Sequence, residues 1–132
     1  MKQIKIEYVT CPSDEHKQIA SYILQLLRGE QVKIKNGLIS MTEKQRQFYT
    51  WGARKFHLIL SEDGCNGIEF SVMGLKFRGR VRIYYNGGTD YFDIEFLYAR
   101  KNQTKKEYED VCFDELHNIC HCYIERSDDP SV

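Results

Sequence analysis

Two runs of alternating hydrophobic and polar residues, between Leu75 and Ala99, form the clearest pattern in the chain. The hydrophobic positions of the first run share one side and are Leu75, Phe77, Val81, Ile83 and Tyr85. In the second run, one side carries Phe92, Ile94, Phe96 and Tyr98, and the other carries Tyr91, Asp93, Glu95 and Leu97. A period of two is typical of strands with one buried face, so both runs are predicted to be β-strands.

The four residues between these runs, Asn86-Gly87-Gly88-Thr89, predict a hairpin turn. Glycine accepts the positive φ that a primed two-residue turn requires, so we expect Gly87 and Gly88 at its centre. The resulting register joins two hydrophobic pairs on one face and two charged pairs on the other, namely Val81–Ile94, Ile83–Phe92, Arg82–Asp93 and Arg80–Glu95. Both faces agree with this single register.

Shorter patterns predict further strands. Alternation indicates strands at residues 2–9, 56–60 and 68–72, and a hairpin at 32–41 around the strong turn signal Asn36-Gly37. The hydrophobic parity changes after residue 72, at Met73-Gly74. We interpret this change as a tight turn that brings Phe70 opposite Phe77 and adds a strand to the meander.

Three helices are predicted from their start and stop signals. The first begins near Pro12-Ser13-Asp14 and ends before Gly29. Thr42 and Gln45 have the spacing of a capping box and predict a short helix through Tyr49, and Thr104 and Glu107 have the same spacing at the start of a C-terminal helix. The buried stripe of that last helix is expected at Tyr108, Cys112, Leu116, Ile119 and Tyr123.

These elements predict an α+β fold, in which an antiparallel meander is packed by an N-terminal and a C-terminal helix. The N-terminal strand and the 32–41 hairpin are further candidates for the same sheet. With 132 residues, the chain is long enough for one domain with a modest core. We expect that domain to span residues 1–126 and to be followed by a flexible tail, 127–132.

Charge is balanced overall but unevenly placed. Nineteen basic and nineteen acidic side chains cancel, yet residues 31–60 hold six Lys/Arg against one acid. Residues 107–129 hold eight acids against Arg126. Five cysteines and the lack of an apolar signal or membrane-spanning run favour free thiols, a cytoplasmic location and no membrane.

The basic segment, residues 31–60, is a candidate nucleic-acid surface, because cations bind phosphates and aromatic rings stack on bases. Its candidate residues are Lys33, Lys35, Arg46, Trp51, Arg54 and Lys55. The alternative is that Phe48 and Trp51 fill the core. A second basic stripe is formed by Lys76, Arg78, Arg80 and Arg82, and there we prefer cross-strand ion pairs on a solvated face.

Two histidines one helical turn apart, His117 and His121, have a spacing that can chelate a metal. On a helix, Asp114 and Glu125 would share their sector, whereas Cys120 and Cys122 would flank it on opposite sides. A solvated helix face is the preferred interpretation, so no metal and no cofactor are expected. The chain also lacks a phosphate-binding glycine loop, a nucleophile elbow and a dinucleotide fingerprint, and we expect no enzymatic activity.

Part of the chain resembles a group of small uncharacterised proteins found in phages and conjugative elements of gut bacteria. The similar segments are residues 19–27, 39–42, 51–56, 81–96 and 111–116. Residues 81–96 resemble the group most, with an alternating strand, an Asn-Gly turn and a Tyr-Asp-hydrophobic-Glu-Phe run. The double glycine and the Cys/His-rich end depart from the group's pattern.

The resemblance implies a small accessory protein of a mobile element, and such proteins often inhibit host defence nucleases such as CRISPR enzymes. We therefore predict an anti-CRISPR-like inhibitor that contacts its protein partner through acidic residues of the C-terminal helix, Glu109, Asp110, Asp114 and Glu115. One alternative is a nucleic-acid-binding module that uses residues 31–60. The other is a homodimeric structural protein that uses a sheet edge or the aromatic face of Tyr84 and Tyr91.

Overall fold

The computed structural model describes residues 6–29 and 33–126. In chain order its elements are β1 (Ile6–Tyr8), α1 (Asp14–Arg28), β2 (Lys33–Lys35), β3 (Leu38–Ser40), α2 (Glu43–Thr50), β4 (Arg54–Ser61), β5 (Asn66–Met73), β6 (Arg78–Asn86), β7 (Tyr91–Leu97), β8 (Thr104–Val111), α3 (Leu116–His121) and the π-helical turn η1 (Cys122–Arg126). The expected tail, 127–132, lies outside the described residues.

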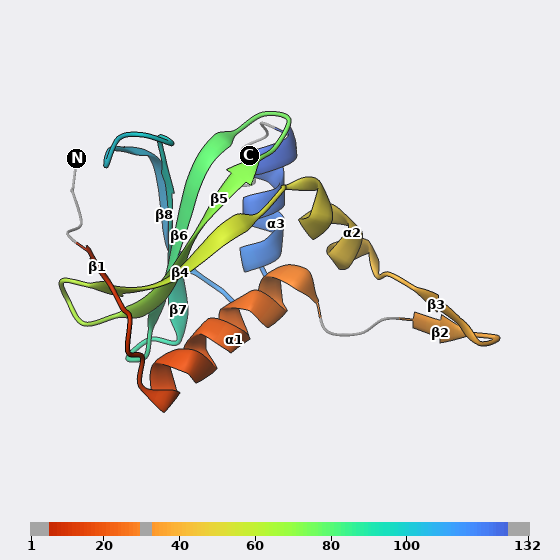
Figure 1. Ribbon diagram of the computed structural model, residues 1–132, viewed down its shortest axis with the longest axis horizontal. Coiled ribbons are helices and arrows are strands. Elements are labelled where there is room, and N and C mark those ends of the chain that lie inside the picture. Colours follow the sequence, from red (N-terminus) through yellow and green to blue (C-terminus); the bar gives the residue numbers. More distant parts are fainter. Residues whose placement is uncertain (1–5, 30–32, 127–132) are drawn as a thin grey trace.

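The fold is α+β, as predicted. Six antiparallel strands form one sheet in the order β1-β4-β5-β6-β7-β8, so β1 and β8 are its edges. The helices α1, α2 and α3 lie on one face of this sheet, whereas β1 and the β7–β8 connection lie toward the other side (Figure 1). The sheet therefore has a helix-covered face and a second face, which carries most of the polar strand residues.

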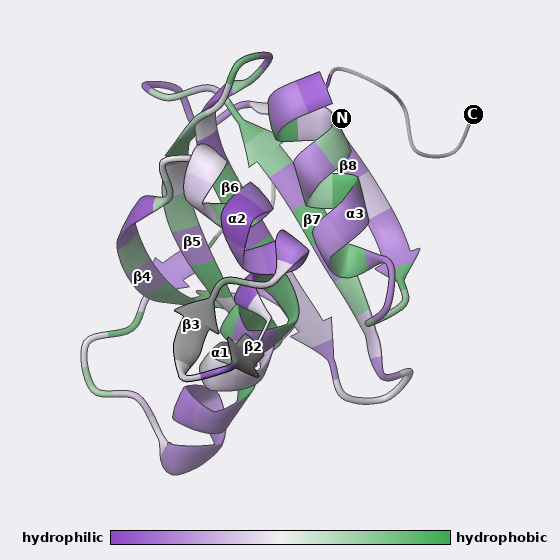
Figure 2. Cartoon of the chain, turned by 90° about the vertical axis from the view of Figure 1, so that its right-hand side faces the viewer, coloured by the Kyte–Doolittle hydropathy of each residue, from purple (hydrophilic) through white to green (hydrophobic). Residues whose placement is uncertain are grey.

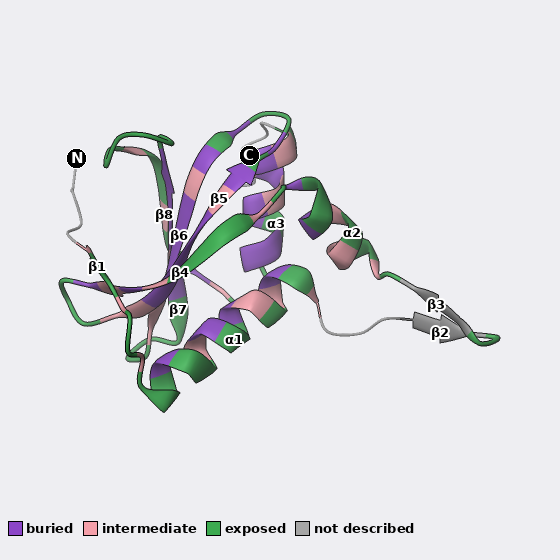
Figure 3. Cartoon of the chain, in the orientation of Figure 1, coloured by how far each residue is buried: buried purple, intermediate pink, exposed green. Residues whose placement is uncertain are grey.

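The hydrophobic core lies between the helices and the central strands. Ile23 and Leu27 of α1 are fully buried against residues such as Phe70 and Ile83 of the sheet. Hydrophobic positions alternate with polar ones along the strands behind the helices (Figure 2), and burial is greatest on β5, β6 and β7 (Figure 3). Trp51, at the end of α2, is also fully buried in this core.

Local signals in the sequence are confirmed where they act over a few residues. Ser13 caps α1 by accepting a hydrogen bond from the His16 amide at 3.1 Å. Thr42 and Gln45 form both bonds of the capping box that begins α2. At the β2–β3 turn, Asn36 and Gly37 have φ of 53° and 77°, as a primed hairpin turn requires.

The β2–β3 hairpin does not belong to the main sheet. It forms its own two-stranded sheet and extends away from the rest of the fold (Figure 1). The predicted pair Ile34–Ile39 is present, whereas the predicted pair of Val32 with Met41 involves a residue outside the described ones. The N-terminal strand does extend the main sheet, because β1 pairs with β4.

The predicted register of the β6–β7 hairpin is wrong by two residues, although its faces are right. The structure pairs Ile83 with Ile94 and Arg82 with Glu95. The reason is a four-residue connection after the closing pair Asn86–Tyr91, in which Asp90 takes the left-handed conformation, with φ of 63°. The Asp90 amide closes this turn by donating to the Asn86 carbonyl at 2.8 Å. A shift by two preserves which side chains share a face.

The turn at Met73-Gly74 is confirmed, but its predicted partner is wrong. Phe70 lies opposite Val81, because β5 and β6 pair from Met73–Arg78 onward and leave residues 74–77 in the connection. The Lys76 and Phe77 amides instead donate to the Ile124 carbonyl, at 3.0 and 3.1 Å. This connection therefore ties the sheet to the C-terminal segment.

The predicted C-terminal helix over 104–123 is also wrong in its first half. Residues 104–111 form the edge strand β8, and helix begins only at Leu116. The capping-box spacing at Thr104 was misleading, because pairing with β7 satisfies this backbone along a whole strand edge. Such tertiary pairing overrides a local helix signal. Only Leu116 and Ile119 of the predicted stripe are buried, together with Cys120 and Ile124.

Candidate functional site

A row of ionisable residues crosses the polar face of the sheet, one from each of five neighbouring strands. Its members are direct cross-strand neighbours and are His57, Glu69, Arg82, Glu95 and Glu107. The middle three are buried, at 4%, 3% and 3% exposure. A buried charge is tolerated only when it is paired, so this row must act as a network.

Arg82 is the centre of that network. Its Nε lies 2.8 Å from Glu69 Oε2, and its guanidinium lies 3.7 Å from Glu95. Burial alone would lower the pKa of Arg82, but its hydrogen bond to Glu69 and the neighbouring charges raise that pKa above its ordinary value. The expected ion pairs of Arg80 and Arg82 on a solvated face are thus corrected, since Arg82 pairs with Glu69 and Glu95 inside the protein.

Further polar groups bind the two buried carboxylates. The Tyr8 hydroxyl of β1 lies 3.0 Å from both oxygens of Glu69, and the Thr104 hydroxyl donates to Glu95. Arg80 lies 3.6 Å from Glu69 and donates to the carbonyls of Tyr98 and Lys101. The network therefore links an edge strand, the central strands and the β7–β8 connection.

The predicted partner-binding acids are all exposed, but they do not lie on a helix. Glu109 and Asp110 lie on β8, and Asp114 and Glu115 lie in the connection to α3. Within the described residues none of the four forms an ion pair. Residues 107–115 hold five acids and no Lys or Arg, so this segment presents uncompensated negative charge to solvent.

Sequence reasoning missed an aromatic residue in the middle of this acidic segment. Phe113 is 56% exposed, and Tyr22 of α1 is 38% exposed. Both line one cavity of about 590 Å³, together with Leu26. The signal was present in the sequence as an aromatic residue directly before two acids, but the predicted helix turned attention to its buried stripe.

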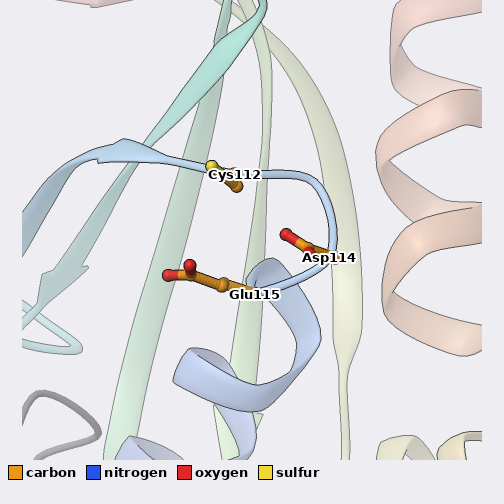
Figure 4. Close-up of side chains that lie close together, drawn as sticks. All are labelled: Cys112, Asp114 and Glu115. Atoms are coloured by element: carbon orange, nitrogen blue, oxygen red, sulfur yellow. The ribbon is translucent and has the colours of Figure 1, made fainter.

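Cys112, Asp114 and Glu115 lie close together in the connection between β8 and α3 (Figure 4). Their potential ligand atoms lie within 4.8 Å of one another, and they are the only such group in the described part of the chain. Partial burial and the Glu115 and Asp114 carboxylates raise the pKa of the Cys112 thiol. A protonated thiol is a poor metal ligand, and exposed acids cluster without a metal in many proteins.

The two predicted metal-binding histidines are held by other bonds. His117 Nδ1 lies 2.6 Å from the Leu27 carbonyl, and its Nε2 lies 2.8 Å from the Gln47 side-chain amide. Trp51 Nε1 donates to His121 Nδ1 at 3.1 Å, and the two imidazole rings stack at 6.0 Å. Burial lowers the pKa of both rings, and that of His117 to about 4. These rings pack beside Trp51 as neutral side chains.

The candidate nucleic-acid residues are scattered over several elements. Lys33 and Lys35 lie on β2, and the described structure does not extend to their side chains. Arg46, Arg54 and Lys55 are exposed, on α2 and at the start of β4. Trp51 is fully buried and is therefore not available for base stacking. The alternative that this ring fills the core is confirmed.

The cysteines and the residues of the predicted dimer surface have the following positions. Cys65 lies in the β4–β5 connection with no histidine among its hydrogen-bond partners in the described residues, and the five cysteines form no disulfide. Tyr84 is 3% exposed, which removes it from the predicted dimer surface, whereas Tyr91 is 40% exposed. Among the described residues, no helix has the length and apolar character needed to cross a membrane.

Comparison with known proteins identifies no relative of this chain. No protein-family model, no curated protein and no solved structure matches it.

Proposed function

We propose that this protein is a non-catalytic binding protein that uses the acidic segment 107–115 to bind a basic surface of another protein. One observation carries the proposal: this segment exposes Phe113 between uncompensated acids. Interfaces concentrate their binding energy in buried aromatic residues, and complementary charge around them steers association and selects the partner. The resemblance to mobile-element proteins suggests the nucleic-acid channel of a host defence nuclease as that basic surface.

The shape next to Phe113 supports the proposal. The adjoining cavity of about 590 Å³ is lined partly by Tyr22 and Leu26, so an apolar partner side chain can be covered there while basic groups meet the acids. Asp114 and Glu115 follow Phe113 directly and are exposed. Because β8 is an edge strand, its acidic side chains also disfavour unspecific strand pairing.

The test is capture of a partner from host lysate with the purified protein, repeated after nuclease treatment and at raised salt. We expect one protein to be retained after nuclease treatment by the wild type, and to be lost with the variant E109K/D110K/D114K/E115K or with Phe113→Ala. The matched control is E62K/D63K, which reverses two exposed acids of the β4–β5 connection. Equal recovery by the wild type and the quadruple variant would refute the acidic surface.

Nucleic-acid binding by residues 31–60 is the competing function. Tyr49 is 68% exposed, and Arg46 lies on the same helix, so one ring remains available for stacking although Trp51 is buried. This function predicts that capture disappears after nuclease treatment. It also predicts affinity for DNA or RNA that falls steeply with salt and with alanine at Arg46 or Arg54.

A homodimer would instead use one of the exposed sheet edges. Size-exclusion chromatography with light scattering separates this possibility from the others, because a dimer persists without any partner.

A further inference from the structure

A cavity of about 380 Å³ opens on the polar face of the sheet, beside His57 and Glu69 of the ionisable row. It is lined by residues from β1, β4, β5 and β6 and from the β7–β8 connection, including Tyr8, His57, Glu69 and Arg80. The strands β4, β5 and β6 separate β1 from β7 in the sheet, yet β1 and the β7–β8 connection both line this cavity. Its volume is within the range of small-molecule sites.

The charges that line this cavity are mainly positive. Lys55, Arg80 and Arg100 contribute three cations, and Glu69 contributes the only acid. Glu69 is occupied by Arg82, Arg80 and Tyr8, so its charge is compensated within the protein. In contrast, Lys55 and Arg100 have no ion pair within the described residues. The cavity therefore offers two uncompensated cations at its exposed side.

Two structural features set the backbone positions from which these cations extend. Lys55 lies at an irregularity of the β4–β5 pairing and has a left-handed backbone, with φ of 58°. Bulges of this kind redirect a side chain and are common near binding sites. Arg80 donates to the carbonyls of Tyr98 and Lys101 and to Asn102 Oδ1, so it holds the connection that carries Arg100 over the cavity.

The aromatic part of the lining suits the remainder of an organic ligand. Tyr8 and His57 meet edge to face, with ring centroids 5.5 Å apart, at the cavity wall. We propose that this cavity binds a small organic anion through an oxyanion group, phosphate or carboxylate, which contacts Lys55 and Arg100. The ligand's organic part then packs against Tyr8 and His57. This site lies apart from the acidic segment and does not depend on its function.

The experiment is isothermal titration calorimetry with four probes at low salt: inorganic pyrophosphate, adenosine monophosphate, citrate and uncharged adenosine. We expect one-site binding of at least one charged probe and none of adenosine. Pyrophosphate or the nucleotide alone would identify a phosphate site, and citrate alone would identify a carboxylate site. Absence of binding for all charged probes at 10 mM, roughly the weak limit for a specific small-ligand site, would overturn the proposal.

Charge-neutral variants of similar size locate the site. We expect Lys55→Gln and Arg100→Gln each to weaken binding about tenfold, since each removes one charge-assisted contact. Lys17→Gln, an exposed cation of α1, is the matched control and should leave affinity unchanged. If all three variants bind the charged probe as tightly as the wild type does, the proposal is overturned. Tighter binding of a 20-nucleotide single strand than of pyrophosphate at the same salt would also overturn it and would favour a nucleic-acid surface. Urea midpoints verify that each variant is folded.

Discussion

Replacing Arg82 by methionine tests whether the buried charge network stabilises the fold. The substitution keeps much of the side-chain length but leaves Glu69 and Glu95, which are 4% and 3% exposed, without their shared cation. Removing one partner of a buried ion pair costs about 3–5 kcal/mol. Because native domains are stable by only about 5–15 kcal/mol, this loss is a large part of the total.

The expected change in melting temperature follows from the chain length. An unfolding entropy of about 2.1 cal/mol/K per residue amounts to roughly 0.28 kcal/mol/K for 132 residues. A loss of 3–5 kcal/mol then lowers the melting temperature by about 10–18 °C. Urea unfolding followed by the fluorescence of Trp51, the only tryptophan and fully buried, measures the same loss at 25 °C.

Two further variants distinguish charge from packing. Arg78→Met removes an exposed cation from the same strand and should change stability by at most about 0.5 kcal/mol. The triple variant E69Q/R82M/E95Q removes all three charges and should recover most of the stability lost in R82M, because no buried charge is left unpaired. A cost below about 1 kcal/mol for R82M, or no recovery in the triple variant, would refute the reasoning.

Three other predictions concern the core, the sheet and a helix cap. The pKa of His117 is lowered to about 4 in the folded protein, so between pH 4 and the ordinary pKa of 6.5 the unfolded chain binds one more proton than the folded chain. The free energy of unfolding should therefore fall by up to about 3 kcal/mol as the pH drops through this window. His117→Gln should flatten this pH dependence. Gly67→Ala should destabilise the fold by roughly 1–3 kcal/mol, because the added Cβ would lie 2.4 Å from the Ile83 carbonyl oxygen. Gly87→Ala is the control, since its Cβ meets only ordinary contacts. Similar urea midpoints for these two variants would contradict the close approach at Gly67. Thr42→Ala should cost about 1 kcal/mol by removing the cap of α2, and an unchanged midpoint would show that this helix end is held by packing instead.

The neutral state of His117 also fixes the hydrogen bonds around it. Because the Leu27 carbonyl can only accept, Nδ1 carries the single proton of the neutral ring. Gln47 Oε1 lies 2.8 Å from Nε2, so a bond to the neutral ring needs a half-turn of this amide that brings its nitrogen to that place. Protonation of the ring would suit the oxygen where it lies but would put a buried charge beside Trp51. These bonds explain why two histidines at metal-binding spacing act as core side chains.

The sequence by itself determined the elements whose signals act within a few residues. Ser13, Asn36-Gly37 and the Thr42 capping box were identified because each satisfies backbone groups of its own turn. Alternation along β6 and β7 likewise determined which side chains face the core, since a strand has only two faces. The α+β class followed from these elements, as did the exposure of the acids at 109–115.

Only the tertiary structure decided the features that depend on distant partners. Thr104–Val111 became a strand because β7 offers an edge to pair with, although its local signal indicated a helix. The β6–β7 register was set by a four-residue connection that closes at Asp90, which alternation cannot distinguish from one two residues shorter. Arg82 is buried because the neighbouring strands place Glu69 and Glu95 against it, and Tyr8 of β1 in turn contacts Glu69. The cavity with Lys55 and Arg100 exists for the same reason, since its wall joins segments that are remote in the chain and meet only after the sheet has formed.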